Sequence, residues 1–142
     1  MLGEWVLDAS VAAKCLFNET DSHLARAFVV SAHGLTAPDF IFVELSSVAA
    51  KKVRRGETSR DFAAEALVRA SGLLTVAAST RPLLRRAFEL ATDKGFSVYD
   101  ALYLALAETK EIPVVTADRK FSERAHALGV AGLVIHFSQV PR

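Results

Sequence analysis

Short apolar runs alternate with longer helical segments along this chain, and this alternation constrains the fold more than any other feature. Residues 5–7, Trp-Val-Leu, form an apolar run too short for a helix, and residues 114–116, Val-Val-Thr, form another. Such runs, apolar throughout rather than at every second position, are typical of strands buried on both faces of a parallel sheet. The sequence therefore predicts an α/β fold, a three-layer sandwich with a mainly parallel central sheet flanked by helices.

The expected boundaries follow from apolar periodicity, caps and chain breakers. We expect strands at residues 5–7, 35–37, 73–76, 114–116 and 133–135. We expect helices at about 11–17, 22–32, 38–55, 58–70, 82–94, 96–108 and 119–128, most of them followed by a glycine stop, including Gly34 after the second. Asp8 or Ser10 is expected to cap the first helix, and Pro38 to open the long one.

Length and composition narrow the class of protein. The 142 residues are expected to form one domain, 1–142, and a hydrophobic content of 51% excludes a disordered chain. With 17 basic and 16 acidic side chains, bulk charge argues neither for nor against a polyanionic partner. The single Cys15 allows no intramolecular disulfide, and no apolar run approaches the ~18 residues of a spanning helix. With no secretory signal at the start, we expect a cytoplasmic protein without a membrane segment.

Two acids follow predicted strands at the point where each strand ends. Asp8 comes directly after residues 5–7, and Asp118 lies two residues past 114–116. If these strands are parallel, both acids emerge at the same carboxyl edge of the sheet. That edge is where open α/β sheets bind ligands.

Two further acids interrupt apolar faces of predicted helices. Asp100 has Phe96 and Tyr103 among its helical neighbours, and Glu44 has Ile41. A carboxylate that a helix turns toward the core is costly unless a cation, a metal or hydrogen-bond donors compensate it. No lysine or arginine shares these contexts as an internal partner, so all four acids raise the question of which charge they face.

A hard divalent cation answers this question. Clustered carboxylates raise one another's pKa values, and Mg²⁺ or Mn²⁺ relieves the repulsion by taking oxygen ligands. Zinc is disfavoured, because the chain has one cysteine and its four histidines lack ligand spacing. Carboxylate-held Mg²⁺ or Mn²⁺ commonly serves phosphate chemistry.

Four motifs carry a resemblance to a known family. Val-Leu-Asp8-Ala-Ser10, Val-Glu44-Leu after Pro38, Tyr-Asp100-Ala-Leu-Tyr-Leu-Ala and Thr116-Ala-Asp118-Arg-Lys-Phe121 together resemble the four-part signature of PIN-domain ribonucleases. Their order and spacing resemble the VapC-type toxins of bacterial toxin–antitoxin pairs over nearly the whole chain. Each motif alone is weak, but four in this order are specific.

The resemblance implies a function and a site. It implies an Mg²⁺- or Mn²⁺-dependent endoribonuclease that hydrolyses RNA with a metal-activated water, leaving a 5′-phosphate and a 3′-hydroxyl. It also implies a homodimer and a cognate antitoxin that blocks the acidic pocket. The metal-binding acids would be Asp8, Glu44, Asp100 and Asp118, with Ser10 and Thr116 at the hydroxyl positions that orient ligands or the metal's water. Some members carry a further acid just after the fourth metal-binding acid, where this chain has Arg119 and Lys120. We therefore expect a second metal to be bound weakly, or only together with RNA.

Simpler explanations compete at each position. Asp8 and Asp118 could cap helices, Glu44 could pair with a lysine, and capping or β-propensity explains Ser10 and Thr116 as well as catalysis does. For contact with substrate phosphates, Arg119 and Lys120 are the better candidates. The run Lys51, Lys52, Arg54 and Arg55 could bind phosphates but is expected on the outer, solvated face of its helix.

Other functions require other residues at these positions. A receiver-type signalling domain needs an aspartate at the end of a middle strand, but residues 73–76 are followed by two alanines. A haloacid-dehalogenase-like phosphatase needs Asp-x-Asp after its first strand, where this chain has Asp8-Ala-Ser10. A catalytically silent PIN-like module that only binds a partner stays open.

Overall fold

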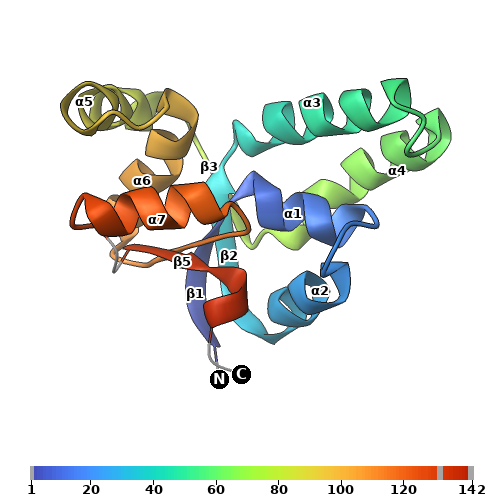
Figure 1. Ribbon diagram of the computed structural model, residues 1–142, viewed down its shortest axis with the longest axis horizontal. Helices are drawn as coiled ribbons and strands as arrows, with labels where there is room; N and C mark the ends of the chain where they lie inside the picture. Colours follow the sequence, from blue (N-terminus) through green and yellow to red (C-terminus); the bar gives the residue numbers. More distant parts are fainter. Residues whose placement is uncertain (1, 131–132, 141–142) are drawn as a thin grey trace.

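The computed structural model describes residues 2–130 and 133–140, whose strands form one five-stranded sheet (Figure 1). The strands are β1 (Leu2–Leu7), β2 (Ala32–Pro38), β3 (Val76–Ala78), β4 (Val114–Thr116) and β5 (Val134–His136). They lie in the order β3-β2-β1-β4-β5, and all four neighbouring pairs are parallel. The prediction of a mainly parallel central sheet is confirmed.

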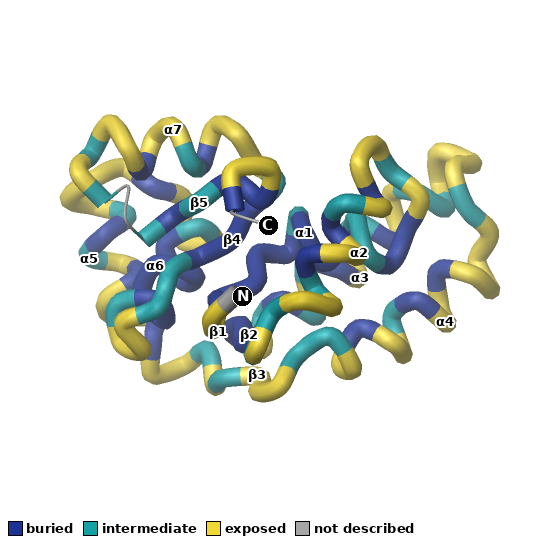
Figure 2. Tube along the Cα trace, turned by 90° about the horizontal axis from the view of Figure 1, so that it is seen from below, coloured by how far each residue is buried: buried dark blue, intermediate teal, exposed yellow. Residues whose placement is uncertain are grey.

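Within residues 2–130 and 133–140, seven α-helices cover the two faces of this sheet. They are α1 (Ala9–Leu16), α2 (Ser22–Ser31), α3 (Ile41–Arg54), α4 (Arg60–Ala70), α5 (Leu84–Lys94), α6 (Val98–Lys110) and α7 (Arg119–Ala127). The chain steps outward from β1 through β2 to β3 and then returns to β4 and β5. Because crossovers between parallel strands are right-handed, the two directions place their helices on opposite faces. Figure 2 shows α1 to α4 on one side of the strands and α5 to α7 on the other, which confirms the three-layer sandwich.

The reversal of direction puts a switch point between β1 and β4. These strands pair with Leu7 opposite Val115, so the residues that follow them emerge together at one edge. The chain leaves β1 toward one face and leaves β4 toward the other. Diverging connections leave a crevice at such a point, which is where ligands bind in open α/β sheets.

The core is built around the two central strands and helix α6. Val6, Leu7, Val114 and Val115 have no solvent exposure. Residues 101–107 of α6 are all buried, since this helix contacts β1, β2 and β4 on one side and α5 on the other. A helix that is apolar around its whole circumference is expected only where it is enclosed in this way.

Several expected boundaries are wrong. The third strand was expected at residues 73–76, but Leu73 belongs to a 3₁₀ turn (Ser71–Leu73), and β3 begins at Val76, opposite Thr36. Gly34 does not stop a helix; it lies inside β2, paired with Glu4. Pro38 ends β2 instead of opening α3. In contrast, Gly56, Gly95 and Gly129 follow helices with positive φ, a conformation that favours glycine at helix ends.

No helix in residues 2–130 or 133–140 is long and apolar enough to cross a membrane.

Candidate active site

A pocket of about 540 Å³ opens at the carboxyl edge of the sheet, beside the switch point. All four predicted acids line it, together with Ala9, Ser10, Phe40, Val43, Ser47, Val48, Lys51 and Tyr99. The acids come from four separate places in the chain: the end of β1, the first turn of α3, the first turn of α6 and the loop after β4. The fold therefore brings together residues that are up to 110 positions apart.

Asp8 is buried at the floor of this pocket and is held by two hydroxyl groups. Thr116 donates to its Oδ2 at 2.7 Å, and Ser10 donates to the same oxygen at 2.5 Å. Burial raises the pKa of Asp8; the two hydroxyl donors lower it, and the charge of Asp118 raises it again. Asp8 occupies the N-cap position of α1, as expected, but its side chain accepts no capping hydrogen bond from a backbone amide of that helix.

Ser10 and Thr116 also fix the loop that follows β4. The Ser10 hydroxyl accepts a hydrogen bond from the amide of Ala117, and the Thr116 hydroxyl accepts one from the amide of Asp118, both at 2.9 Å. Each hydroxyl has one hydrogen, and both hydrogens point at Asp8. These two side chains therefore tie the end of β1 to the end of β4 and set the orientation of the Asp8 carboxylate.

Asp118 is exposed and caps α7. Its Oδ1 accepts a hydrogen bond from the amide of Phe121 at 3.2 Å, as an N-cap side chain does. Its carboxylate also raises the pKa values of Asp8 and Asp100, so the cap lies within electrostatic range of both. The capping explanation of Asp118 is correct, and it leaves the second carboxylate oxygen available to the pocket.

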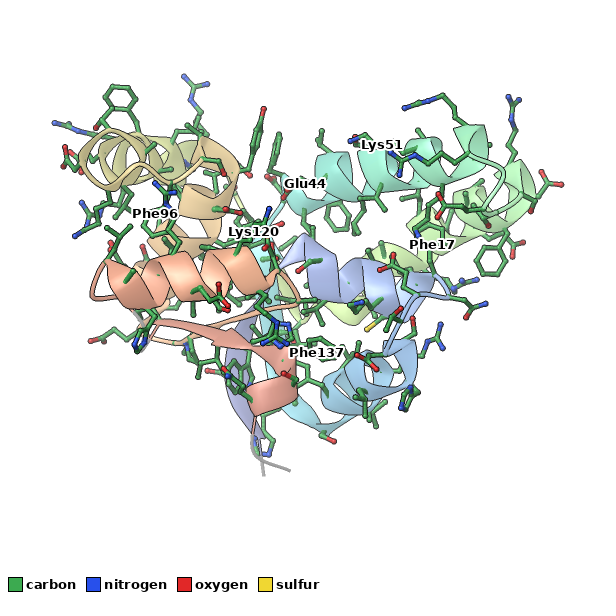
Figure 3. The ribbon with its side chains drawn as sticks, in the orientation of Figure 1. Phe17, Glu44, Lys51, Phe96, Lys120 and Phe137 are labelled. Carbon is green, nitrogen blue, oxygen red and sulfur yellow. The ribbon has the colours of Figure 1, made fainter. Side chains whose placement is uncertain are left out.

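Glu44, which Figure 3 labels, lies in the first turn of α3 and accepts a hydrogen bond from a tyrosine of α6. The Tyr103 hydroxyl donates to Oε1 of Glu44 at 2.6 Å. Burial raises the pKa of Glu44; the Tyr103 bond lowers it, and the charge of Asp8 raises it. Sequence reasoning missed the role of Tyr103, although a tyrosine three residues after Asp100 on a buried helix was a usable signal.

Asp100 lies in the first turn of α6, not in the helix interior as the sequence suggested. Ser97 caps this helix, and its hydroxyl accepts a hydrogen bond from the Asp100 amide at 3.1 Å. An acid here is favoured by the partial positive charge of the helix start. Even so, burial and then the charges of Asp8, Asp118 and Glu44 raise the pKa of Asp100 to about 7.

The basic side chains of α3 do not all lie in the same surroundings. Lys51 lines the pocket with Glu44, which lies two turns earlier on α3. Lys52 points elsewhere, pairs with Glu19 at 3.0 Å, and has a side chain only 16% exposed. Lys51, Arg54 and Arg55 are exposed as expected, and the expectation of a solvated basic face is wrong for Lys52 alone. Arg54, at the end of α3, is exposed and outside the pocket lining.

Arg119 and Lys120 both lie in the first turn of α7 and are exposed. Neither belongs to the lining of the acidic pocket, and Arg119 lines a separate pocket of about 260 Å³ with Ser122 and His126. Figure 3 labels Lys120 at the start of α7, immediately after the loop that carries Asp118.

The donor chemistry of the pocket fits a hard divalent cation. Four carboxylates face it, and in the part of the chain that the structure describes none of them forms an ion pair with a lysine, arginine or histidine. Oxygen donors without a cationic partner suit Mg²⁺ or Mn²⁺. Across the described residues, no three acidic, histidine or cysteine side chains lie closely enough together to hold a metal.

Comparison with known proteins identifies the family. The family model of the PIN domain matches residues 5–127, a span that contains all four acids. The chain belongs to the PIN-domain family. Over 125 residues it is 34% identical to Ribonuclease VapC3 of Pyrobaculum aerophilum, covering 87% of this chain and 95% of that protein.

Two solved structures share the fold. PAE2754 from Pyrobaculum aerophilum superimposes with a TM-score of 0.73 at 21% identity, over 95% of this chain and 84% of the other. VapC20 of Mycobacterium tuberculosis, described as a sarcin-ricin loop cleaving toxin, gives a TM-score of 0.59 at 21% identity, over 87% of this chain and 94% of the other. The PIN-like arrangement of sheet and helices is therefore shared with known structures.

Proposed function

We propose that this PIN-domain protein is a metal-dependent endoribonuclease that acts as the toxin of a toxin–antitoxin pair. The observation that carries the proposal is the meeting of Asp8, Glu44, Asp100 and Asp118 in one pocket at the switch point of the sheet. The 34% identity to a ribonuclease named VapC3 supports the reaction class.

The four acids would hold Mg²⁺ or Mn²⁺. A cation bound by carboxylates lowers the pKa of water and neutralises charge on phosphate oxygens, which is the chemistry that phosphodiester hydrolysis needs. The raised pKa values of Asp8, Glu44 and Asp100 support a cation site, since their mutual repulsion is relieved by a positive charge. Cleavage by hydrolysis on this pattern would leave a 5′-phosphate and a 3′-hydroxyl.

The protein's own groups position these acids. Ser10 and Thr116 hold Oδ2 of Asp8, which directs its other oxygen away from them. The amide of Phe121 holds Oδ1 of Asp118, and Tyr103 holds Oε1 of Glu44. Each of these three acids thus keeps an oxygen that no described side chain occupies, so ligand binding need not break the bonds that orient them.

The partners follow from the same proposal. The substrate would be RNA, whose phosphates Lys51 would approach from the pocket wall, with Arg119, Lys120 and Arg54 further out. A cognate antitoxin would block the acidic pocket, and the toxin would be a homodimer.

RNA cleavage by purified variants tests the proposal. We expect wild type to cleave RNA in Mg²⁺ or Mn²⁺, and Asp8→Asn or Asp100→Asn to abolish cleavage while the fold is retained. Asp93→Asn, which changes an exposed acid at the end of α5, is the matched control and should cleave like wild type. An Asp100→Asn protein that cleaves at the wild-type rate would sink the assignment, and a folded wild type that cleaves no RNA would favour a silent interaction module.

A further inference from the structure

Two aromatic rings form one wall of the acidic pocket. Phe40 lies just before α3, four residues from Glu44, and Tyr99 lies in the first turn of α6, next to Asp100. Their ring centroids are 5.5 Å apart and their planes differ by 15°, so the rings are stacked. Both residues line the pocket that the four acids share.

The exposure of Tyr99 is unusual for an aromatic residue in such a place. Tyr99 is 56% exposed, whereas Tyr103, one turn further along the same helix, is 1% exposed and bonded to Glu44. Phe40 stacks against one face of the Tyr99 ring, and Tyr99 remains 56% exposed beside it. The pocket therefore offers an open aromatic surface beside its carboxylates.

We propose that the open face of Tyr99 stacks an unpaired nucleobase of the RNA, next to the phosphate that is cleaved. This inference rests on the proposed function and adds a specificity-determining residue to it. Phe40 packs behind Tyr99 and fixes the plane of the ring, so little side-chain freedom is lost when a base binds. Tyr99 contacts a base and not the reacting atoms, so it acts in binding.

The surroundings of the ring favour RNA over a protein partner. Lys51 lines the same pocket and supplies a positive charge for the backbone of a nucleic acid. The ring lies beside the carboxylates of the proposed cation site, and a bound cation would contact the phosphate of the substrate. Since a nucleobase is only one sugar away from its phosphate, a base next to the cleaved bond can reach the ring. Proteins that bind single-stranded nucleic acid combine basic side chains along the backbone with aromatic rings that stack on bases, and Lys51 and Tyr99 supply one group of each kind here.

The stacked ring also predicts the class of RNA. Base–aromatic stacking accepts any base, because every base has a π face, so Tyr99 selects for an unpaired base rather than for a sequence. In a duplex the base must first leave its stack, which opposes binding. We therefore expect cleavage in single strands and loops, and poor cleavage of fully paired RNA.

Cleavage kinetics on matched intact and abasic single-stranded substrates test the inference. Short single-stranded oligoribonucleotides of mixed sequence are first cleaved with wild type to map the bond, and an abasic residue is then placed on either side of that bond. We expect Tyr99→Leu, which keeps an apolar side chain but removes the ring, to raise KM for the intact substrate about tenfold with little change in kcat. Tyr99→Phe keeps the ring, so its KM should stay well below that of Tyr99→Leu.

The abasic substrate separates stacking from a general effect on the pocket. The KM of wild type should rise about tenfold when the stacked base is absent. The KM of Tyr99→Leu should be the same on the abasic and intact substrates, because the mutation and the missing base remove one and the same contact. A 2-aminopurine at the same position should lose fluorescence on mixing with wild type and Tyr99→Phe, but not with Tyr99→Leu. Phe88→Leu is the matched control, since Phe88 is 63% exposed on α5 and lies outside the pocket lining.

Three results would overturn the stacking inference. The first is an unchanged KM for Tyr99→Leu, and the second is the same rise in KM, relative to wild type, on the abasic substrate as on the intact one. The third is a change in self-association with unchanged KM. The last result would assign the ring to a protein interface. These failures differ from failure of the proposed function, because in each of them wild type still cleaves the oligoribonucleotides.

Discussion

Tyr103 on α6 donates its phenolic hydrogen to Oε1 of Glu44 on α3 at 2.6 Å, and this bond joins helices from opposite faces of the sheet. The two helices meet above the carboxyl edge, where the sheet no longer separates them. The bond therefore fixes Glu44, an acid that the strands themselves cannot position.

Replacing Tyr103 by phenylalanine tests this bond. Tyr103→Phe keeps the buried ring and removes the donor, so we expect a loss of about 1 to 2 kcal/mol in the free energy of unfolding, since the acceptor is a charged group. The pKa of Glu44 should rise further, because the bond that lowers it is gone. Urea unfolding measures the first effect, and the pH dependence of RNA cleavage measures the second. Tyr99→Phe, which removes an exposed hydroxyl, is the control, and equal stabilities for both variants would contradict the account.

Asp100 should make the metal-free protein less stable as the pH rises. Its ordinary pKa is 3.8 and its pKa in the fold is about 7, so between these values the folded protein keeps a proton that the unfolded chain releases. Stability contributed by this group is thus present at low pH and is lost as pH increases from about 4 to about 7. We expect chelator-treated Asp100→Asn to show a shallower decline, with a remainder from Asp8 and Glu44, whose pKa values are also raised. Thermal unfolding across this range measures the slopes, and identical slopes would argue against the assignment.

Divalent metal should stabilise the folded protein through the same acids. A ligand that binds only the folded state stabilises that state by RT ln(1 + [L]/Kd), so tighter binding raises the melting temperature further. Millimolar Mg²⁺ or Mn²⁺ should therefore raise the Tm of wild type more than that of Asp8→Asn or Asp100→Asn. Equal shifts in all three proteins would count against a metal site at these residues.

Lys51 and Lys52 are neighbours with different expected roles. Lys51 faces the pocket, so Lys51→Ala should weaken RNA binding across sequences and reduce the slope of log K against log salt by about 1. Lys52 pairs with Glu19 and lies over the ring of Phe17, so Lys52→Ala should lower stability by about 0.5 to 1 kcal/mol and leave the salt slope unchanged. Binding of labelled RNA at several salt concentrations separates them, and identical slopes would contradict the assignment of Lys51.

The sequence predicted the meeting of the acids because strand direction follows from the βα alternation. Once the strands after residues 5–7 and 114–116 are parallel, Asp8 and Asp118 must emerge at one edge. It did not predict which bonds hold them. The contact between Tyr103 and Glu44 spans 59 residues, and that between Thr116 and Asp8 spans 108, so both depend on the register of packed elements rather than on local pattern.

The wrong boundaries have a similar cause. Leu73 and Leu74 form an apolar run, but β3 is a short edge strand whose position is set by pairing with residues 36–38 of β2. Val76, its first residue, is half exposed, so hydrophobicity gives no sign of the strand's start. Hydrophobicity also fails to separate Lys51 from Lys52. These two residues are identical in type and adjacent in sequence, and they differ only in the side of α3 from which their side chains project.

RNA cleavage followed through removal and return of metal tests the central claim most directly. Wild type is incubated with RNA in Mg²⁺, then with an excess of chelator, and then with an excess of Mn²⁺, with Asp100→Asn treated in parallel. The account predicts cleavage by wild type that stops with chelator and resumes with Mn²⁺, and no cleavage by Asp100→Asn at any stage. Wild-type cleavage that continues unchanged in chelator, or Asp100→Asn cleavage at the wild-type rate, would contradict it.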